Sequence, residues 1–226
     1  MLRQLNVERA ARRPVIVVTD IGDGEQRLVK AADIPADPLR AELGKQLRMG
    51  KSGMIEAAGK KLFLNVHAPT AKLVMVGAVH ISQALAPLAR SLDYDVTVVD
   101  PRTAFASPER FPDVPLIAEW PDVALPPLNI DHYTAFVALT HDPKIDDPAL
   151  LHAFQRGCFY IGALGSRKTH AKRAERLKAQ GANEADVARI HAPIGLPIGA
   201  VSPSEIAVAI MAEITAQLRL PKEAAA

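Results

Sequence analysis

The chain has 226 residues, of which 49% are hydrophobic and 23% charged, and its formal net charge is +2. This composition is typical of a globular protein and excludes the bulk positive charge of a nucleic-acid-binding protein. The single cysteine, Cys158, excludes an internal disulfide and a cysteine-rich zinc site, and its apolar flanks predict a buried thiol. No apolar run approaches the roughly 20 residues that span a bilayer, and the N-terminus has no long apolar stretch, so we expect a cytoplasmic protein without a membrane span.

Residues 1–70 predict a small α+β unit. Strands are expected at 15–19 and 26–31, followed later by a hairpin whose turn contains Gly59. Between them, a helix is expected after Asp37, because Asp37 and the proline that follows it form a plausible cap and first-turn pair and leucines then recur at every fourth residue. We find no residue in this unit that carries obvious chemistry.

From residue 71 to about residue 220 the pattern changes to alternating strands and helices. This predicts an α/β domain with a Rossmann-like, open and mostly parallel sheet and helices on both faces. An apolar run at 73–76 precedes an amphipathic helix, and the next apolar run ends at Asp100, 23 residues after Gly77. That spacing is close to the usual distance of a ribose-binding carboxylate.

The dinucleotide fingerprint of this unit is broken. Val79 and Ser82 stand where the G-x-G-x-x-G pattern has its second and third glycines. The second glycine normally lets a pyrophosphate approach the backbone closely, and a branched valine opposes that approach. The leading interpretation is therefore a Rossmann fold with an altered or lost site, and binding of NAD(P) or FAD is an alternative that Val79 weakens.

Three further strands are expected at 115–118, 134–139 and 159–164. The second of them ends in T-H-D-P, which brings Thr140, His141 and Asp142 to the carboxyl edge of the sheet, where open α/β sheets bind ligands. The alternative is that His141 and Asp142 only shape a turn and cap a helix. Two Asp-Pro pairs, beginning at Asp142 and Asp147, are both able to start helices.

The third of these strands leads into the segment Y-I-G-A-L-G-S-R-K-T-H. Gly162 and Gly165 allow backbone conformations closed to other residues, and Ser166 can cap the helix that follows. The first turn of that helix offers unpaired N–H groups with Arg167 and His170 beside them, an arrangement that receives phosphates and carboxylates. The alternative is a strand-to-helix connection with a solvated basic face.

The segment 189–201 is rich in proline, glycine and apolar residues, which excludes a regular helix. Such a loop either packs against its own domain or forms a surface for a partner. Ser202, Pro203 and Glu205 then form a capping box that starts the last helix. Residues 221–226 are expected to form a frayed tail.

Five blocks in this order resemble the C-terminal domain of the XdhC/CoxI family of xanthine dehydrogenase accessory factors: V-V-D-P-R, T-H-D-P-K-I-D-D-P-A-L, Y-I-G-A-L-G-S-R-K-T-H-A-K-R, R-I-H-A-P-I-G-L-P-I-G-A and S-E-I-A-V-A-I-M-A-E-I. The resemblance covers residues 71–218. It implies a chaperone, rather than an enzyme, that binds molybdenum cofactor and passes it to an apo molybdenum hydroxylase such as xanthine or carbon monoxide dehydrogenase. The cofactor-binding residues that the resemblance implies are Gly77, His80, Asp100, Arg102, Thr140, His141, Asp142, Gly162, Gly165, Ser166, Arg167 and His170.

Two features depart from the family pattern. The family's nucleotide turn usually reads G-A-G-H where this chain has G-A-V-H, and the first 70 residues contain neither the family's S-G-G-C-V-E motif nor any cysteine. The resemblance therefore does not extend to cysteine-dependent handling of molybdenum or sulfur, unless a separate chain supplies that motif. No metal site is expected, because the histidines and aspartates show no recognisable ligand spacing.

Two other functions stay open at this point. One is an NAD(P)- or FAD-dependent oxidoreductase, which the strand-helix-strand unit and Asp100 favour. The other is a scaffold that has lost cofactor binding and docks an apo-hydroxylase through the apolar loop at 190–201. Whether the chain forms a homo-oligomer is also open.

Overall fold

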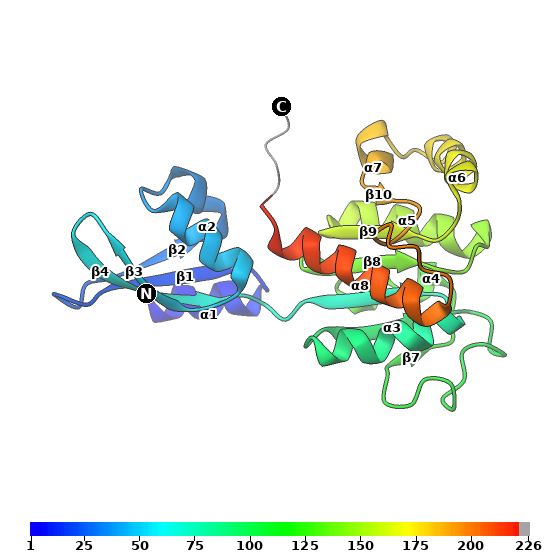
Figure 1. The fold of residues 1–226 in the computed structure, drawn as a ribbon, viewed down its shortest axis with the longest axis horizontal. Coiled ribbons are helices and arrows are strands. Elements are labelled where there is room, and N and C mark those ends of the chain that lie inside the picture. The colour runs from blue at the N-terminus through cyan, green and yellow to red at the C-terminus, as the bar shows by residue number, and fades with distance from the viewer. Residues whose placement is uncertain (222–226) are drawn as a thin grey trace. The chain divides into compact units, whose positions relative to one another are not determined.

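The computed structural model describes residues 1–221 and divides into two compact units (Figure 1). Of the described residues, 1–69 and 219–221 belong to the first unit, and residues 70–218 form the second. Apart from residue 221, the frayed tail expected at 221–226 lies outside the described residues. Within the described part of the chain, no helix is long and apolar enough to cross a membrane.

The first unit contains a four-stranded antiparallel sheet in the order β2-β1-β4-β3. Its strands are β1 (Val15–Asp20), β2 (Gln26–Lys30), β3 (Gly53–Ala57) and β4 (Lys60–His67). Its helices are α1 (Leu2–Ala10), the 3-10 helix η1 (Ala31–Ala36) and α2 (Arg40–Met49). Leu43 of α2 packs with Ile16 and Leu64 of the sheet in the core of this unit.

The prediction that Asp37 caps α2 is wrong by two residues, because the residue at the cap position is Leu39. The Asp37 carboxylate accepts a hydrogen bond from the Leu39 amide and pairs with the Arg27 guanidinium, so it closes a turn ahead of the helix. The helix begins at Arg40 and ends before Gly50, which takes the left-handed conformation common after a helix C-terminus.

The second unit contains a six-stranded sheet in the order β10-β9-β8-β5-β6-β7, with every neighbouring pair parallel. Its strands are β5 (Lys72–Val76), β6 (Asp95–Val99), β7 (Leu116–Ile117), β8 (Thr134–Ala138), β9 (Tyr160–Ala163) and β10 (Ile190–His191). Renumbered within this unit, the strand order is 3-2-1-4-5-6, which is the doubly wound Rossmann order. The prediction of a Rossmann-like α/β fold preceded by a small α+β unit is therefore confirmed.

Helices cover both faces of the parallel sheet (Figure 1). The helices of this unit are α3 (His80–Ser91), α4 (Pro121–Ala124), the 3-10 helix η2 (Pro126–Leu128), α5 (Pro143–Arg156), α6 (Arg167–Ala179), α7 (Glu184–Ala188) and α8 (Pro203–Arg219). Alternate residues of a strand face opposite sides of a sheet. Met75 of β5 accordingly packs in the core with Leu85 of α3 and Ile210 of α8, whereas Val74 packs with Leu150 of α5.

The prediction that Asp147 and Pro148 can start a helix is wrong, because α5 runs through both residues. Asp142 caps this helix by accepting a hydrogen bond from the Lys144 amide, and Pro143 occupies the first helical position. Pro148 is tolerated inside the helix, and the Asp147 carboxylate pairs with an arginine of α6 instead of capping.

The burial of individual side chains tests the predictions for the loop 189–201 and for Cys158. The segment 189–201 begins as the short strand β10 and is otherwise irregular, and it contains a buried residue, Ile194, as well as the strongly exposed Val201. Cys158 is buried as predicted, and burial raises the pKa of its thiol to about 12.

Candidate functional site

The carboxyl ends of β5 and β8 meet where the strand order of the second unit reverses. Gly77 follows β5 with a φ of +118°, and a Cβ atom there would lie 2.9 Å from Cγ2 of Thr140, which follows β8. Both the backbone conformation and this contact require glycine at position 77. Ligands of open α/β sheets bind outside the strand ends at this point of the topology.

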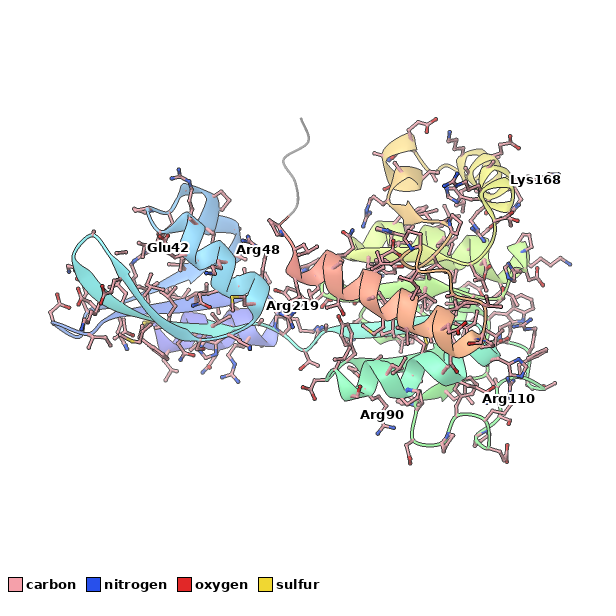
Figure 2. The ribbon with its side chains drawn as sticks, viewed as in Figure 1. Glu42, Arg48, Arg90, Arg110, Lys168 and Arg219 are labelled. Carbon is pink, nitrogen blue, oxygen red and sulfur yellow. The ribbon has the colours of Figure 1, made fainter. Side chains whose placement is uncertain are left out.

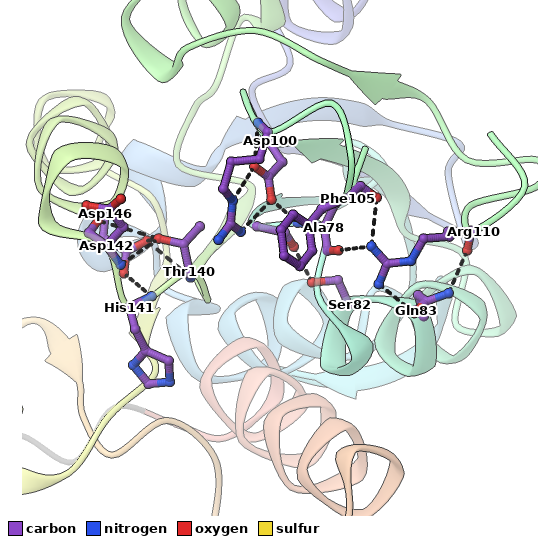
Figure 3. A network of polar contacts seen from close by, with 12 residues as sticks. Ala78, Ser82, Gln83, Asp100, Phe105, Arg110, Thr140, His141, Asp142 and Asp146 are labelled. Atoms are coloured by element: carbon purple, nitrogen blue, oxygen red, sulfur yellow. Dashed lines mark hydrogen bonds and ion pairs between the residues drawn. The ribbon is translucent and has the colours of Figure 1, made fainter. Parts of the chain in front are cut away.

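Asp100, at the end of β6, directs its carboxylate into the unit (Figure 3). The residue is fully buried, and Oδ2 accepts hydrogen bonds from the Ala78 amide at 2.7 Å and from Arg102 Nη2 at 2.7 Å. Oδ1 accepts from the Arg102 amide and from Arg102 Nε, both at 2.9 Å. Burial raises the pKa of this carboxyl, but the hydrogen bonds from Arg102 and Ala78 outweigh it and hold the pKa below its ordinary value.

Arg102, rather than the buried Asp100 carboxylate, is the partly exposed member of this ion pair at the sheet edge. Its side chain is 31% exposed, and its guanidinium lies 4.4 Å from the centroid of the Phe105 ring. The hydrogen bond to Asp100 is the main cause that raises the pKa of Arg102, and the charges of Asp142 and Asp146 add to it. The ends of β6 and β8 thus influence each other electrostatically.

A loop after β6 is tied to the turn at Ala78 (Figure 3). Arg110 Nη1 donates to the carbonyl oxygens of Ala78 at 2.9 Å and Phe105 at 2.8 Å, and Nη2 donates to Oε1 of Gln83 at 2.9 Å. The sequence patterns considered above did not identify Arg110, because it follows Ala78 by 32 residues and belongs to no motif. With Asp100 on the Ala78 amide and Arg110 on the Ala78 carbonyl, both polar groups of this peptide segment are already bonded within the chain.

The β8-α5 turn is organised by Asp146, which motif reasoning also missed. Its carboxylate accepts from Thr140 Oγ1 at 2.7 Å and from the His141 amide at 3.1 Å. Burial raises the pKa of Asp146, and these hydrogen bonds oppose that shift. His141 is held in a left-handed conformation, with a φ of +65°, and is exposed to solvent.

The β9-α6 turn has the cap and the glycine that the sequence predicts. Gly165 has a φ of +128°, and Ser166 Oγ accepts from the Thr169 amide at 3.2 Å. Arg167 and Lys168 are exposed on the first turn of α6, whereas His170 is partly buried. Figure 2 labels Lys168 on this turn. Burial lowers the pKa of His170, and the charge of Arg173 lowers it further.

The conformational role predicted for Gly162 is wrong. This glycine lies inside β9, is buried, and does not have a left-handed φ. A Cβ atom there would lie only 2.5 Å from Cδ1 of Ile194, so glycine is required because the loop after β10 packs directly on the strand. Gly162 thus supports the position of that loop and stands apart from the residues at the sheet edge.

The predicted site residues, apart from Gly162, lie at the carboxyl ends of parallel strands or on the first two turns of the helices that follow. They divide into a crevice group, Gly77, His80, Asp100, Arg102, Thr140, His141 and Asp142, and an α6 group, Gly165, Ser166, Arg167 and His170. His80 is the exposed first residue of α3. In the described residues, no group of three or more His, Cys, Asp or Glu side chains is arranged to hold a metal ion.

Comparison with known proteins identifies relatives across the second unit. The model of the XdhC Rossmann domain matches residues 73–214. The chain is 32% identical over 154 residues to a probable component of the xanthine dehydrogenase of Bacillus subtilis (strain 168), covering 68% of this chain and 44% of that protein. It is 31% identical over 155 residues to the molybdenum cofactor insertion chaperone PaoD of Escherichia coli (strain K12), covering 69% and 42% respectively.

A further relative and one solved structure extend this comparison. The chain is 32% identical over 175 residues to the protein YqeB of Escherichia coli (strain K12), covering 74% of this chain and 32% of that protein. The chain therefore spans less than half the length of the curated relatives it matches. The crystal structure of a xanthine dehydrogenase from Bacillus halodurans has the same fold, with a TM-score of 0.69 and 23% identity over 96% of this chain and 66% of that chain.

Proposed function

Because the chain belongs to the XdhC Rossmann domain family, we propose that it is an accessory protein that binds molybdenum cofactor and assists its insertion into a xanthine dehydrogenase-type molybdenum hydroxylase. The names of two relatives support this proposal, one as a molybdenum cofactor insertion chaperone and one as a probable component of a xanthine dehydrogenase. In this function the cofactor is a cargo that the protein holds and releases, and the chain itself catalyses no reaction.

The observation that carries the proposal is the chemistry of the sheet edge. Molybdenum cofactor is an anion with a phosphate and a pterin. The edge offers positive charge from Arg102 and Arg167 and the amide N–H groups at the start of α6, all of which suit an anion. His141, exposed at the end of β8, adds a side chain that is able to donate or accept a hydrogen bond to a heterocycle.

We infer from these positions which part of the cofactor each group of residues binds. We assign the phosphate to the α6 group, in which Gly165 and Ser166 shape the turn and Arg167 and His170 lie beside it. We assign the pterin to the crevice group, in which Asp100 holds Arg102 in place and Asp146 holds Thr140 and His141. Each charge-assisted hydrogen bond contributes about 1.5–3 kcal/mol, so useful affinity requires several of them together.

Retention of purified molybdenum cofactor by the immobilised chain tests this function. Arg167→Ala should weaken retention several-fold, because Arg167 is the first residue of α6. Lys178→Ala is the matched control, since Lys178 lies on the last turn of the same helix, where it pairs with Glu184. No retention by the unaltered chain would contradict the proposal, and equal losses in the two variants would indicate diffuse electrostatic attraction instead of a site.

The oxidoreductase alternative is tested by the thermal shift of the chain with NAD, NADP and FAD. A ligand that binds the native state raises the unfolding temperature in proportion to the logarithm of its concentration above the dissociation constant. Because the Asp100 carboxylate and the Ala78 amide are bonded to each other, we expect no shift with these dinucleotides. A shift that grows with dinucleotide concentration would favour the enzyme.

A further inference from the structure

Arg173, on the second turn of α6, is a buried cation with unmet hydrogen-bonding capacity. It is 2% exposed, and its Nη2 donates to the Leu164 carbonyl at 2.7 Å. Its Nε and Nη1 are buried and have no hydrogen-bond partner among the described residues. Buried polar groups in proteins are nearly always paired, so an arginine with two unpartnered nitrogens needs an explanation.

The two carboxylates whose charges act on Arg173, those of Asp146 and Asp147, already accept hydrogen bonds from other groups. Asp146 accepts from the side chain and amide of Thr140 and from the amide of His141. Both oxygens of Asp147 accept from Arg176, at 2.7 and 3.0 Å. Burial lowers the pKa of Arg173, and these two carboxylates oppose that shift without bonding to the guanidinium.

The Arg173 side chain extends back toward the start of its own helix. Side chains on a helix tilt toward its N-terminus, and Arg173 reaches back to the residue that precedes Gly165. The first turn of α6 contains no acidic residue, although anions are the charges that stabilise a helix N-terminus. Ser166 caps only the Thr169 amide, which leaves further N–H groups of that turn without intrahelical acceptors.

We propose that Arg173 and the β9-α6 turn form one binding site for a phosphate monoester or a similar tetrahedral oxyanion. This inference deepens the proposed function and rests on it for the identity of the physiological ligand. An oxyanion in the turn accepts from the amides of the first helical turn and gives Arg173 the acceptor that its own chain does not supply. Because the guanidinium is buried in the free chain, the proposal requires that it becomes accessible when the oxyanion binds, and that Arg173 rather than an exposed lysine decides the affinity.

The test is titration of the full chain with inorganic phosphate, with chloride at equal ionic strength as the reference. Calorimetry on the unaltered chain, Arg173→Met and Arg176→Met compares two arginines one turn apart on α6, of which only Arg176 has a carboxylate partner. We expect phosphate to bind the unaltered chain and Arg176→Met alike, and Arg173→Met to lose at least ten-fold in affinity. Equal binding by the two variants, or phosphate binding no better than chloride, would overturn the proposal.

A second measurement on the unaltered chain covers the case in which Arg173→Met does not fold. In nitrogen-15 NMR spectra, phosphate should shift the Nε–H signal of Arg173 and the amide signal of Gly165, and unchanged signals would overturn the inference. Comparison with cofactor retention separates it from the proposed function. Phosphate binding without cofactor retention supports the anion site and contradicts the cofactor proposal. Cofactor retention that is unchanged in Arg173→Met supports the cofactor proposal and contradicts the anion site.

Discussion

The substitution Asp100→Asn removes a charge that hydrogen bonds hold inside the second unit. The buried carboxylate accepts from the Ala78 amide and from N–H groups of Arg102, and an asparagine of the same size turns one acceptor into a donor that faces another donor. Removing one partner of a buried ion pair costs about 3–5 kcal/mol. The Arg102 side chain is 31% exposed and can regain water, so we expect a loss of about 2–3 kcal/mol in the free energy of unfolding.

Urea denaturation followed by circular dichroism measures this loss, and the unfolding temperature should fall by about 4–12 °C. Asp95→Asn, exposed at the other end of β6, is the control and should stay within about 0.5 kcal/mol. The pKa of Asp100 is lowered in the folded chain, so its contribution is present above the unfolded value of 3.8 and is lost as the pH falls through the folded pKa. If Asp100→Asn is as stable as Asp95→Asn at pH 7, the buried hydrogen bonds do not hold the turn.

Three further substitutions or modifications test the packing of the second unit. Gly162→Ala should cost about 1–3 kcal/mol in urea denaturation, because its Cβ would lie 2.5 Å from Ile194 Cδ1, and an unchanged midpoint would contradict this contact. Ile194→Asp should unfold the unit, since Ile194 is 8% exposed, whereas Ile198→Asp, at a residue 55% exposed, should change stability by about 0.5 kcal/mol at most. Similar losses of stability in the two variants would show that the whole loop at 189–201 belongs to the core of the unit. Cys158 should react with a thiol reagent at pH 8 only after denaturation, because burial raises its pKa to about 12, and rapid labelling of the native chain would exclude that burial.

Features with local causes could be predicted from the sequence. Ser166, Asp142 and Ser202 each cap a helix through a side-chain oxygen that accepts from an amide two or three residues ahead, so neighbouring residue types are sufficient to identify them. The alternation of strands and helices likewise predicted the doubly wound sheet, because buried parallel strands are continuous apolar runs. The placement of Thr140 at the sheet edge followed from the same pattern.

Features with distant causes could not be predicted in this way. Gly162 lacks a side chain because Ile194 packs on it, and that contact exists only once β10 pairs with β9. Asp147 resembled a helix cap by its proline, but an ion pair with Arg176 of α6 uses its carboxylate. Arg173 is one of several cations on α6, and only the packed structure shows that it is buried while its neighbours are solvated.

The hydrogen bonds at the sheet edge also disfavour the usual dinucleotide-binding role of Asp100. In a dinucleotide site the carboxylate after the second strand accepts from a ribose hydroxyl and the glycine turn admits a pyrophosphate. Here the corresponding Asp100 accepts from the Ala78 amide and from Arg102, so the same residues close the turn and leave a guanidinium to face solvent. At the end of β6, Arg102 thus neutralises the buried Asp100 carboxylate and is the partly exposed member of the pair. A ribose hydroxyl therefore has no free carboxylate acceptor at this position, which disfavours the oxidoreductase alternative.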